Sequence, residues 1–320
     1  MLSFILRRLG LAFFLLFVIS LISFFIVTLT PGSPYPWGEM NPKISPELKE
    51  AFRKKFHLDR PLPVQYYLML HDLFTGKLRS MKDELPVLRK ILDRLPASLR
   101  LNITAMLFSL SCGTLLGIYG ARYAGHWHDI LSSFLAFLLI ALPGFWIAYL
   151  VVIGLVKHVG IPILGTQSYG IDFPNEFSRW LDQTWHLMLP ALILSLGALA
   201  IQSRYLRASM IETLREHYIL TAQAKGLSSS AIFYKHALRN SLRPLITGIG
   251  MLLPSLISGT VIIESIFAYP GMGQLGYQAV LERDYPMLVA LNFIVAALVL
   301  IGNFISDLLY AVVDPRVRLE

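Results

Sequence analysis

Six long stretches without a charged side chain constrain the fold of this chain more than any other feature. Each is long enough, or nearly so, to cross a bilayer core, which takes about 20 helical residues. Each is expected to be a helix, because a lone strand would leave its backbone polar groups unpaired in hydrocarbon. The sequence therefore predicts an all-α polytopic membrane protein with six transmembrane helices, at Leu9–Thr30, Leu101–Ala121, Ile130–Val156, Leu187–Ser203, Pro244–Ile263 and Pro286–Ser306.

The composition supports a membrane protein. Hydrophobic residues make up 55% of the chain and charged residues only 15%, which is outside the usual range of soluble domains. The single cysteine, Cys112, lies inside the second predicted span, so no disulfide framework is expected. The net charge of +8 lacks the interleaved aromatic residues of single-strand binders. Nucleic acid is therefore not an expected partner, whereas membrane lipids are, through their anionic headgroups.

Basic residues predict the orientation in the membrane. The short segment 204–243 carries seven Lys and Arg against two Glu, and short loops of this kind stay in the cytoplasm. Six spans then place both termini in the cytoplasm as well. The segment 31–100 carries 13 Lys and Arg against 8 Asp and Glu, but it exceeds the length of about 60 residues over which the rule applies. It is therefore predicted to be extracytoplasmic.

This orientation divides the chain into three parts. Residues 1–30 form an N-terminal tail and the first span, residues 31–100 an extracytoplasmic helical loop, and residues 101–320 a core with the other five spans. In the extracytoplasmic loop, Ser45 is placed to cap a helix that starts at Pro46. Two further amphipathic segments, 64–74 and 87–95, are expected to be helical. Such a loop either contacts a soluble donor protein or covers the outer surface.

The pattern of residues 218–230 predicts a helix, a break and a second helix. Residues 218–225 are good helix formers, and Gly226 suits a left-handed residue just past the end of a helix. Ser228 or Ser229 is then placed to cap a second helix from Ala231 to Asn240.

Seven motifs, taken in order, resemble the dipeptide/oligopeptide permease family, the membrane subunits of binding-protein-dependent ABC importers. The resemblance runs from Leu6 to the C-terminus. Within it, residues 221–226 resemble the cytoplasmic coupling loop, whose pattern is Glu-Ala-Ala, three residues, Gly. Leu220 stands where that pattern has Glu, and Arg239 where it has Pro. The motifs are Leu58–Tyr66, Leu95–Leu99, Thr221–Leu227, Lys235–Asn240, Glu264–Gly273, Arg283–Pro286 and Asp314–Arg316.

The resemblance implies a type I ABC importer permease in a bacterial inner membrane. Its expected partners are a second permease subunit, two cytoplasmic ATP-binding subunits and an extracytoplasmic solute-binding protein. Relatives carry peptides, glutathione or nickel, and no residue here selects among these cargoes. A coupling helix should present small side chains to a groove of the ATPase, a role that Ala222 and Ala224 would fill. The implied ATPase-coupling residues are Thr221, Ala222, Gln223, Ala224, Lys225, Gly226 and Leu227.

The chain itself is not expected to be an enzyme. It has no Gly-x-x-x-x-Gly-Lys-Ser/Thr loop to hold phosphates, so ATP and Mg²⁺ are expected in partner subunits and no cofactor in this chain. Recognised hydrolase and metalloprotease motifs are also missing. The alternative is a secondary transporter or channel subunit that works without ATPases, but the spans show neither repeats nor a charged midplane site.

Acidic and proline residues near the membrane supply the remaining hypotheses. Glu264 lies near the end of the fifth predicted span, where an acid is a functional candidate. With the turn formed by Pro270, Gly271 and Gly273 it is predicted to form an outer gate, and a purely structural role is the alternative. The segment His126–Asp129 is interpreted as an ordinary interfacial turn, without a metal. Pro143 is expected to bend the third span.

Overall fold

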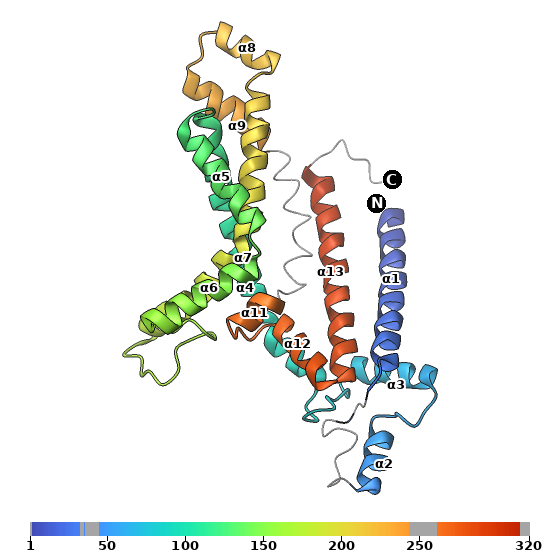
Figure 1. Ribbon diagram of the computed structural model, residues 1–320. Helices are drawn as coiled ribbons and strands as arrows, with labels where there is room; N and C mark the ends of the chain where they lie inside the picture. The colour runs from blue at the N-terminus through green and yellow to red at the C-terminus, as the bar shows by residue number, and fades with distance from the viewer. Residues whose placement is uncertain (1, 33–34, 36–44, 243–260, 314–320) are drawn as a thin grey trace.

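The chain is almost entirely helical in the computed structural model, which describes residues 2–32, 35, 45–242 and 261–313 (Figure 1). Over these residues there is no β-strand, and the nearest approach to one is a single bridge between Arg79 and Pro86. The predicted all-α class is therefore confirmed.

Among the residues that the structure describes, four helices are long and apolar enough to cross a membrane. They contain the first, second, fourth and sixth predicted spans, and they are α1 (Leu2–Leu29), α4 (Val87–Arg122), α7 (Glu176–Thr213) and α13 (Tyr285–Val313). The fifth predicted span, Pro244–Ile263, lies outside the described residues except for its last three, which begin α11 (Val261–Ile266).

The third predicted span is not one straight helix. α5 (Trp127–Ala141) is followed by α6 (Gly144–Val152) and a π-helical continuation, η1 (Ile153–Val159), and the two parts meet at 93°. Pro143 causes the bend, because its ring disfavours helical geometry in the preceding residue, and Leu142 is indeed extended, with φ −82° and ψ 129°. The bend expected at Pro143 is confirmed, and the bent pair counts as a fifth span only if both parts are taken together.

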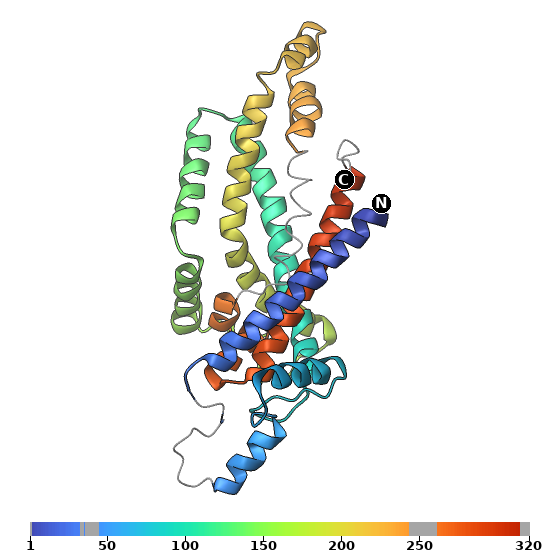
Figure 2. The ribbon, with the colours of Figure 1, turned by 90° about the vertical axis from the view of Figure 1, so that its right-hand side faces the viewer.

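α4 and α7 pack closely along their length, and glycines on α4 permit this approach. A Cβ placed on Gly117 would come within 2.9 Å of both the Leu206 side chain and the Ser203 carbonyl oxygen, and one on Gly113 within 3.1 Å of the Leu199 carbonyl oxygen. Small residues at a four-residue spacing are a common way for membrane helices to come close. Figure 2 shows this pair beside α5, with α8 at one end of the molecule.

The segment between α1 and α4 folds as helices that share a core with the rest of the chain. Ser45 caps α2 (Pro46–Lys55) by accepting a hydrogen bond from the Leu48 N–H, as predicted. α3 (Leu62–Phe74) follows, and the third predicted helix continues through Pro96 as the start of α4. Buried residues of these parts pack against α12 (Met272–Glu282) and α13, among them Leu73, Leu78, Ile91, Met272 and Met287.

The turn between α4 and α5 is held by a buried carboxylate. Asp129 is 2% exposed and pairs with the Arg207 guanidinium of α7 through both carboxylate oxygens. It also accepts a hydrogen bond from the Gly125 N–H at 2.9 Å. The only acid of the His126–Asp129 segment is thereby committed to joining α5 to α7.

Candidate functional site

The predicted helix, break and helix of residues 218–230 is present at one tip of the molecule (Figures 1 and 2). α8 (His217–Ala224) is capped by Lys225 and followed by Gly226, whose φ is +77°. The Gly226 N–H donates to the Gln223 carbonyl oxygen at 2.9 Å and the Leu227 N–H to that of Ala222 at 3.3 Å. These two bonds form a Schellman motif, which satisfies the last carbonyls of a helix through a left-handed residue.

Ser228 caps the second helix of the hairpin. Its hydroxyl accepts a hydrogen bond from the Ala231 N–H at 3.3 Å, so Ser228 rather than Ser229 is the capping serine. The chain continues as η2 (Ala231–Ala237), a π-helical segment, and α9 (Leu238–Ser241). The expected second helix is thus confirmed in position, but its first two turns have π rather than α geometry.

The small face predicted for α8 is only half right. Ala222 is 7% exposed and packs with Ile219 and Ile232 inside the hairpin. Ala222 therefore joins α8 to η2, and Ala224 remains on the exposed side. The spacing of Ile219 and Ala222 brings both to one side of a helix, a signal that could have placed Ala222 inward.

The outward face of α8 carries both polar and apolar side chains. Its exposed residues are His217, Tyr218, Leu220, Thr221, Gln223 and Ala224, and Lys225, Gly226 and Leu227 are exposed in the turn beyond. Leu220, a large apolar side chain, is 54% exposed. Two bonds fix the hairpin to its base: Asn240 Nδ2 donates to the Tyr218 hydroxyl at 2.7 Å, and the Ser241 hydroxyl to that of Thr213 at 3.0 Å.

The structure brings Glu264 together with the turn that was predicted to accompany it. Glu264 is fully buried. Its Oε1 accepts from the Ser98 hydroxyl of α4 at 2.7 Å, and its Oε2 accepts from the Gln274 N–H of α12 at 2.9 Å. The Met272 N–H donates in turn to Ser98 Oγ at 2.8 Å. One carboxylate therefore joins α4, α11 and the start of α12.

The two glycines of the turn make room for this carboxylate. A Cβ on Gly271 would lie 2.3 Å from the Glu264 carboxyl carbon, and one on Gly273 would lie 2.8 Å from the Val261 backbone nitrogen. Pro270 precedes them and is partly buried, next to Tyr269, whose N–H donates to the Glu264 carbonyl oxygen at 2.7 Å. All four predicted gate residues are thus close together.

The burial of a third carboxylate, that of Asp284, was not anticipated. Asp284, 3% exposed, accepts hydrogen bonds from the Ser80 hydroxyl and from the Met81 N–H, the latter at 3.0 Å. Burial raises the pKa of Asp284 above its ordinary value, against the opposing effect of these hydrogen bonds. Asp284 lies in the Arg283–Pro286 motif and Ser98 in the Leu95–Leu99 motif. Both motifs were recognised in the sequence, but no contact was assigned to either.

Comparison with known proteins extends over the whole chain. Residues 113–319 match the family described as "Binding-protein-dependent transport system inner membrane component", and residues 1–102 match the N-terminal part of such components. The oligopeptide transport system permease protein AppB of Bacillus subtilis is 36% identical, with 99% of this chain and all of that protein covered.

Two dipeptide transport system permease proteins are similarly related. DppB of Lactococcus lactis is 35% identical, with 100% of both chains covered, and DppB of Escherichia coli K12 is 33% identical, with 99% of both covered. Full coverage means that the α8 hairpin, the Glu264 cluster and the segment before α4 all fall inside the matched region. The chain therefore belongs to the family of inner-membrane components of binding-protein-dependent transport systems, and it is a multi-pass membrane protein.

Proposed function

We propose that this chain forms half of the translocation pathway of an ABC importer for peptides or similar small solutes. The α8 hairpin carries the proposal: a short helix, closed by Gly226, stands at the tip of the molecule with most of its surface exposed. A helix in this position can dock into a separate ATPase subunit. The curated relatives, which are named as oligopeptide and dipeptide permeases, support the cargo class.

The proposed complex contains a second permease subunit, two cytoplasmic ATP-binding subunits and an extracytoplasmic solute-binding protein. ATP and Mg²⁺ are bound by the ATP-binding subunits. Large apolar side chains remain exposed on α1 and α5, for example Phe13 at 72% and Phe134 at 62%. Such surfaces suit lipid or a second membrane subunit.

The proposed topology has six spans and both termini in the cytoplasm, with the α8 hairpin on the same side. The Glu264 cluster lies on the other side of the molecule from α8, near α11 and α12 (Figure 1), and in this topology it belongs to an outer gate. Closing and opening would then change the contacts among α4, α11 and α12 that Glu264 now holds.

Co-purification tests the proposed assembly. We expect the tagged chain, extracted in mild detergent, to bring down a second permease and two ATP-binding subunits, and the complex to hydrolyse ATP. A secondary transporter or channel subunit would be purified without ATPases. A preparation that transports cargo in proteoliposomes with no ATP-binding subunit present would therefore contradict the proposal.

Cysteine labelling tests the topology. In a Cys112→Ser background, a cysteine at Arg89, whose side chain is 81% exposed, should react with an impermeant maleimide in intact cells. A cysteine at the exposed Ser229 should react only after the membrane is permeabilised. Arg89 is a better labelling position than Ser80 in the same segment, because the Ser80 side chain is fully buried against Asp284. The opposite labelling pattern would place the α8 hairpin outside, where no ATPase could reach it.

A further inference from the structure

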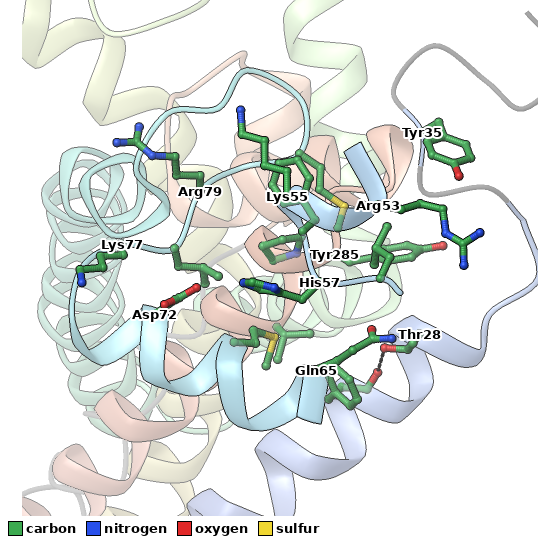
Figure 3. A pocket seen from close by; sticks show the side chains of 18 of the residues that line it. Thr28, Tyr35, Arg53, Lys55, His57, Gln65, Asp72, Lys77, Arg79 and Tyr285 are labelled. Carbon is green, nitrogen blue, oxygen red and sulfur yellow. Dashed lines mark hydrogen bonds between the residues drawn. The ribbon is translucent and has the colours of Figure 1, made fainter. Parts of the chain in front are cut away.

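A pocket of about 410 Å³ lies where the segment before α4 meets the ends of α1 and α13 (Figure 3). Its lining comes from α1, α2, α3, the loop after α3 and the start of α13. Asp72 is the one acid among the lining residues that the structure describes. The basic lining residues are Arg53, Lys55, His57, Lys77 and Arg79.

Contacts of α3 with both spans place this pocket at the membrane surface. The Tyr66 hydroxyl of α3 lies 2.6 Å from the Ser20 hydroxyl, nine residues before the end of α1. At the other end of α3, the Phe74 ring lies 5.5 Å from the ring of Phe293, eight residues into α13. At 1.5 Å per residue, both contacts are about 12–14 Å inside the ends of the helices. Because α1 and α13 have 28 and 29 residues and each exceeds a bilayer core of about 30 Å by roughly 6 Å at either end, the contacts lie roughly 6–8 Å below the edge of the core, as in interfacial helices.

The side chains of α3 are distributed as expected for a helix at the membrane surface. Tyr67 and Phe74 are 66% and 73% exposed, as expected for apolar side chains that face lipid. Gln65, Met69 and Asp72 recur at the spacing of one helix face and line the pocket. The pocket therefore opens on the side of α3 that faces away from the hydrocarbon, at the level of lipid headgroups.

His57 supplies an independent indication that the pocket has a ligand. It follows the end of α2 with φ +57°, and its neighbours close a Schellman motif in which Leu58 N–H donates to the Arg53 carbonyl oxygen at 2.8 Å. Glycine is the usual residue there, because a side chain strains the left-handed conformation. The imidazole lies near the centre of the pocket, beside Asp72 in the view of Figure 3. A strained residue whose side chain occupies a pocket points to a functional use.

Two of the cations are available to an anion. Lys55 is paired with Glu84 at 2.6 Å, and Arg79 donates to the Glu84 carbonyl oxygen at 2.9 Å. Arg53 and Lys77 form no ion pair with any described residue, and both are exposed at the rim. Arginine and lysine are the side chains that bind phosphate through charge-assisted hydrogen bonds.

We propose that this pocket binds the phosphate-bearing headgroup of an anionic phospholipid, from the leaflet at the ends of α1 and α13 remote from α8. His57 contacts the phosphate, and Arg53 and Lys77, which lie on opposite sides of it at the rim (Figure 3), attract the anionic headgroup by their charge. The apolar part of the lining, which includes Phe24, Met69 and Val289, contacts the glycerol and the first carbons of the acyl chains. A free phosphate would gain nothing from these apolar side chains, so the lining favours the lipid.

Native mass spectrometry of the purified full-length chain, with whatever subunits co-purify, tests this site. We expect phosphatidylglycerol to be retained in preference to phosphatidylcholine. The double variant Arg53→Gln/Lys77→Gln should weaken phosphatidylglycerol binding about 25-fold, since each cation near an anionic lipid contributes about fivefold. The control Lys54→Gln/Arg89→Gln removes the same charge from side chains that do not line the pocket and should bind like the parent.

His57→Gly keeps the proposal testable if charge changes disturb folding. Glycine suits φ +57°, so this variant should be at least as resistant to thermal unfolding as the parent while losing several-fold in lipid affinity. Equal phosphatidylglycerol binding by the parent and both pocket variants would overturn the proposal. Competition by glycerol phosphate at the concentration at which the lipid binds would assign the site to a soluble anion. Unchanged lipid binding with lost docking of the solute-binding protein would assign it to a protein partner, and either result overturns the lipid assignment.

Discussion

Gly226→Val should leave the chain in the membrane but uncouple it from its ATP-binding subunits. No atom lies within 4 Å of a Cβ built on Gly226, so valine meets no steric obstacle. The cost comes from the backbone alone, because φ is +77° and a β-branched side chain strains this conformation by about 1–3 kcal/mol. The strain falls on the Gly226 and Leu227 hydrogen bonds that end α8. We expect ATPase affinity to fall by up to about 100-fold, and transport to fall severely.

Gly226→Asn is the matched control, because asparagine adopts the left-handed region far more readily than valine. It should retain most of the ATPase binding. Membrane insertion, co-purification of the ATP-binding subunits and cargo transport measure the three expected outcomes for each variant. A fully active Gly226→Val complex with its ATPases bound would show that residues 218–230 are not the coupling element.

Glu264→Ala should have the second large effect, and on assembly rather than on coupling. It removes the acceptor of two buried donors, the Ser98 hydroxyl and the Gln274 N–H, and leaves a cavity beside Gly271. Each unsatisfied buried group costs about 1–3 kcal/mol, and the cavity adds to this. We expect a loss of roughly 3–5 kcal/mol in the free energy of unfolding, seen as poor yield of the complex and a lower unfolding temperature.

Glu264→Gln distinguishes a role of Glu264 in an outer gate from a purely structural role. Glutamine keeps the shape and one acceptor oxygen, and the Ser98 hydroxyl can turn to accept from its amide. This variant should assemble, and its cargo-stimulated ATPase rate should change if the cluster forms an outer gate. Glu176→Gln, at a side chain that is 86% exposed, is the control for loss of an acid. Normal rates in a normally assembled Glu264→Gln complex would leave Glu264 with a structural role only.

The helical parts of this fold could be read from the sequence wherever the signal was local. Capping by Ser45, the left-handed turn at Gly226 and the bend at Pro143 each depend on a residue and its immediate neighbours. These features were predicted because the backbone preferences that cause them act over a few residues.

Contacts between distant parts of the chain were harder to predict from the sequence. Glu264 could be assigned to the turn of Gly271 and Gly273, which is near in sequence, but its bond to Ser98 spans 166 residues. The bond between Ser80 and Asp284 spans 204. No periodicity or spacing reports such pairs, because they depend on how α4, α12 and α13 pack. The inward side of Ala222 was indicated locally only by its spacing from Ile219, and the contact with Ile232 in the returning helix depends on how the hairpin folds.

α7 gives this architecture a mechanical property. Its 38 residues make an unbroken helix about 57 Å long, nearly twice the thickness of a bilayer core. One end leads into the α8 hairpin, and near the other Asp182 holds the loop that precedes it through the Ser168 N–H and hydroxyl, both at 2.7 Å. A tilt of about 10° around the middle of such a rod moves each end by about 5 Å. If α7 tilts as one rod, a displacement of α8 arrives at the opposite surface with equal size and reversed direction, and Pro190 inside α7, which removes one backbone hydrogen bond, is the position where that motion would be absorbed.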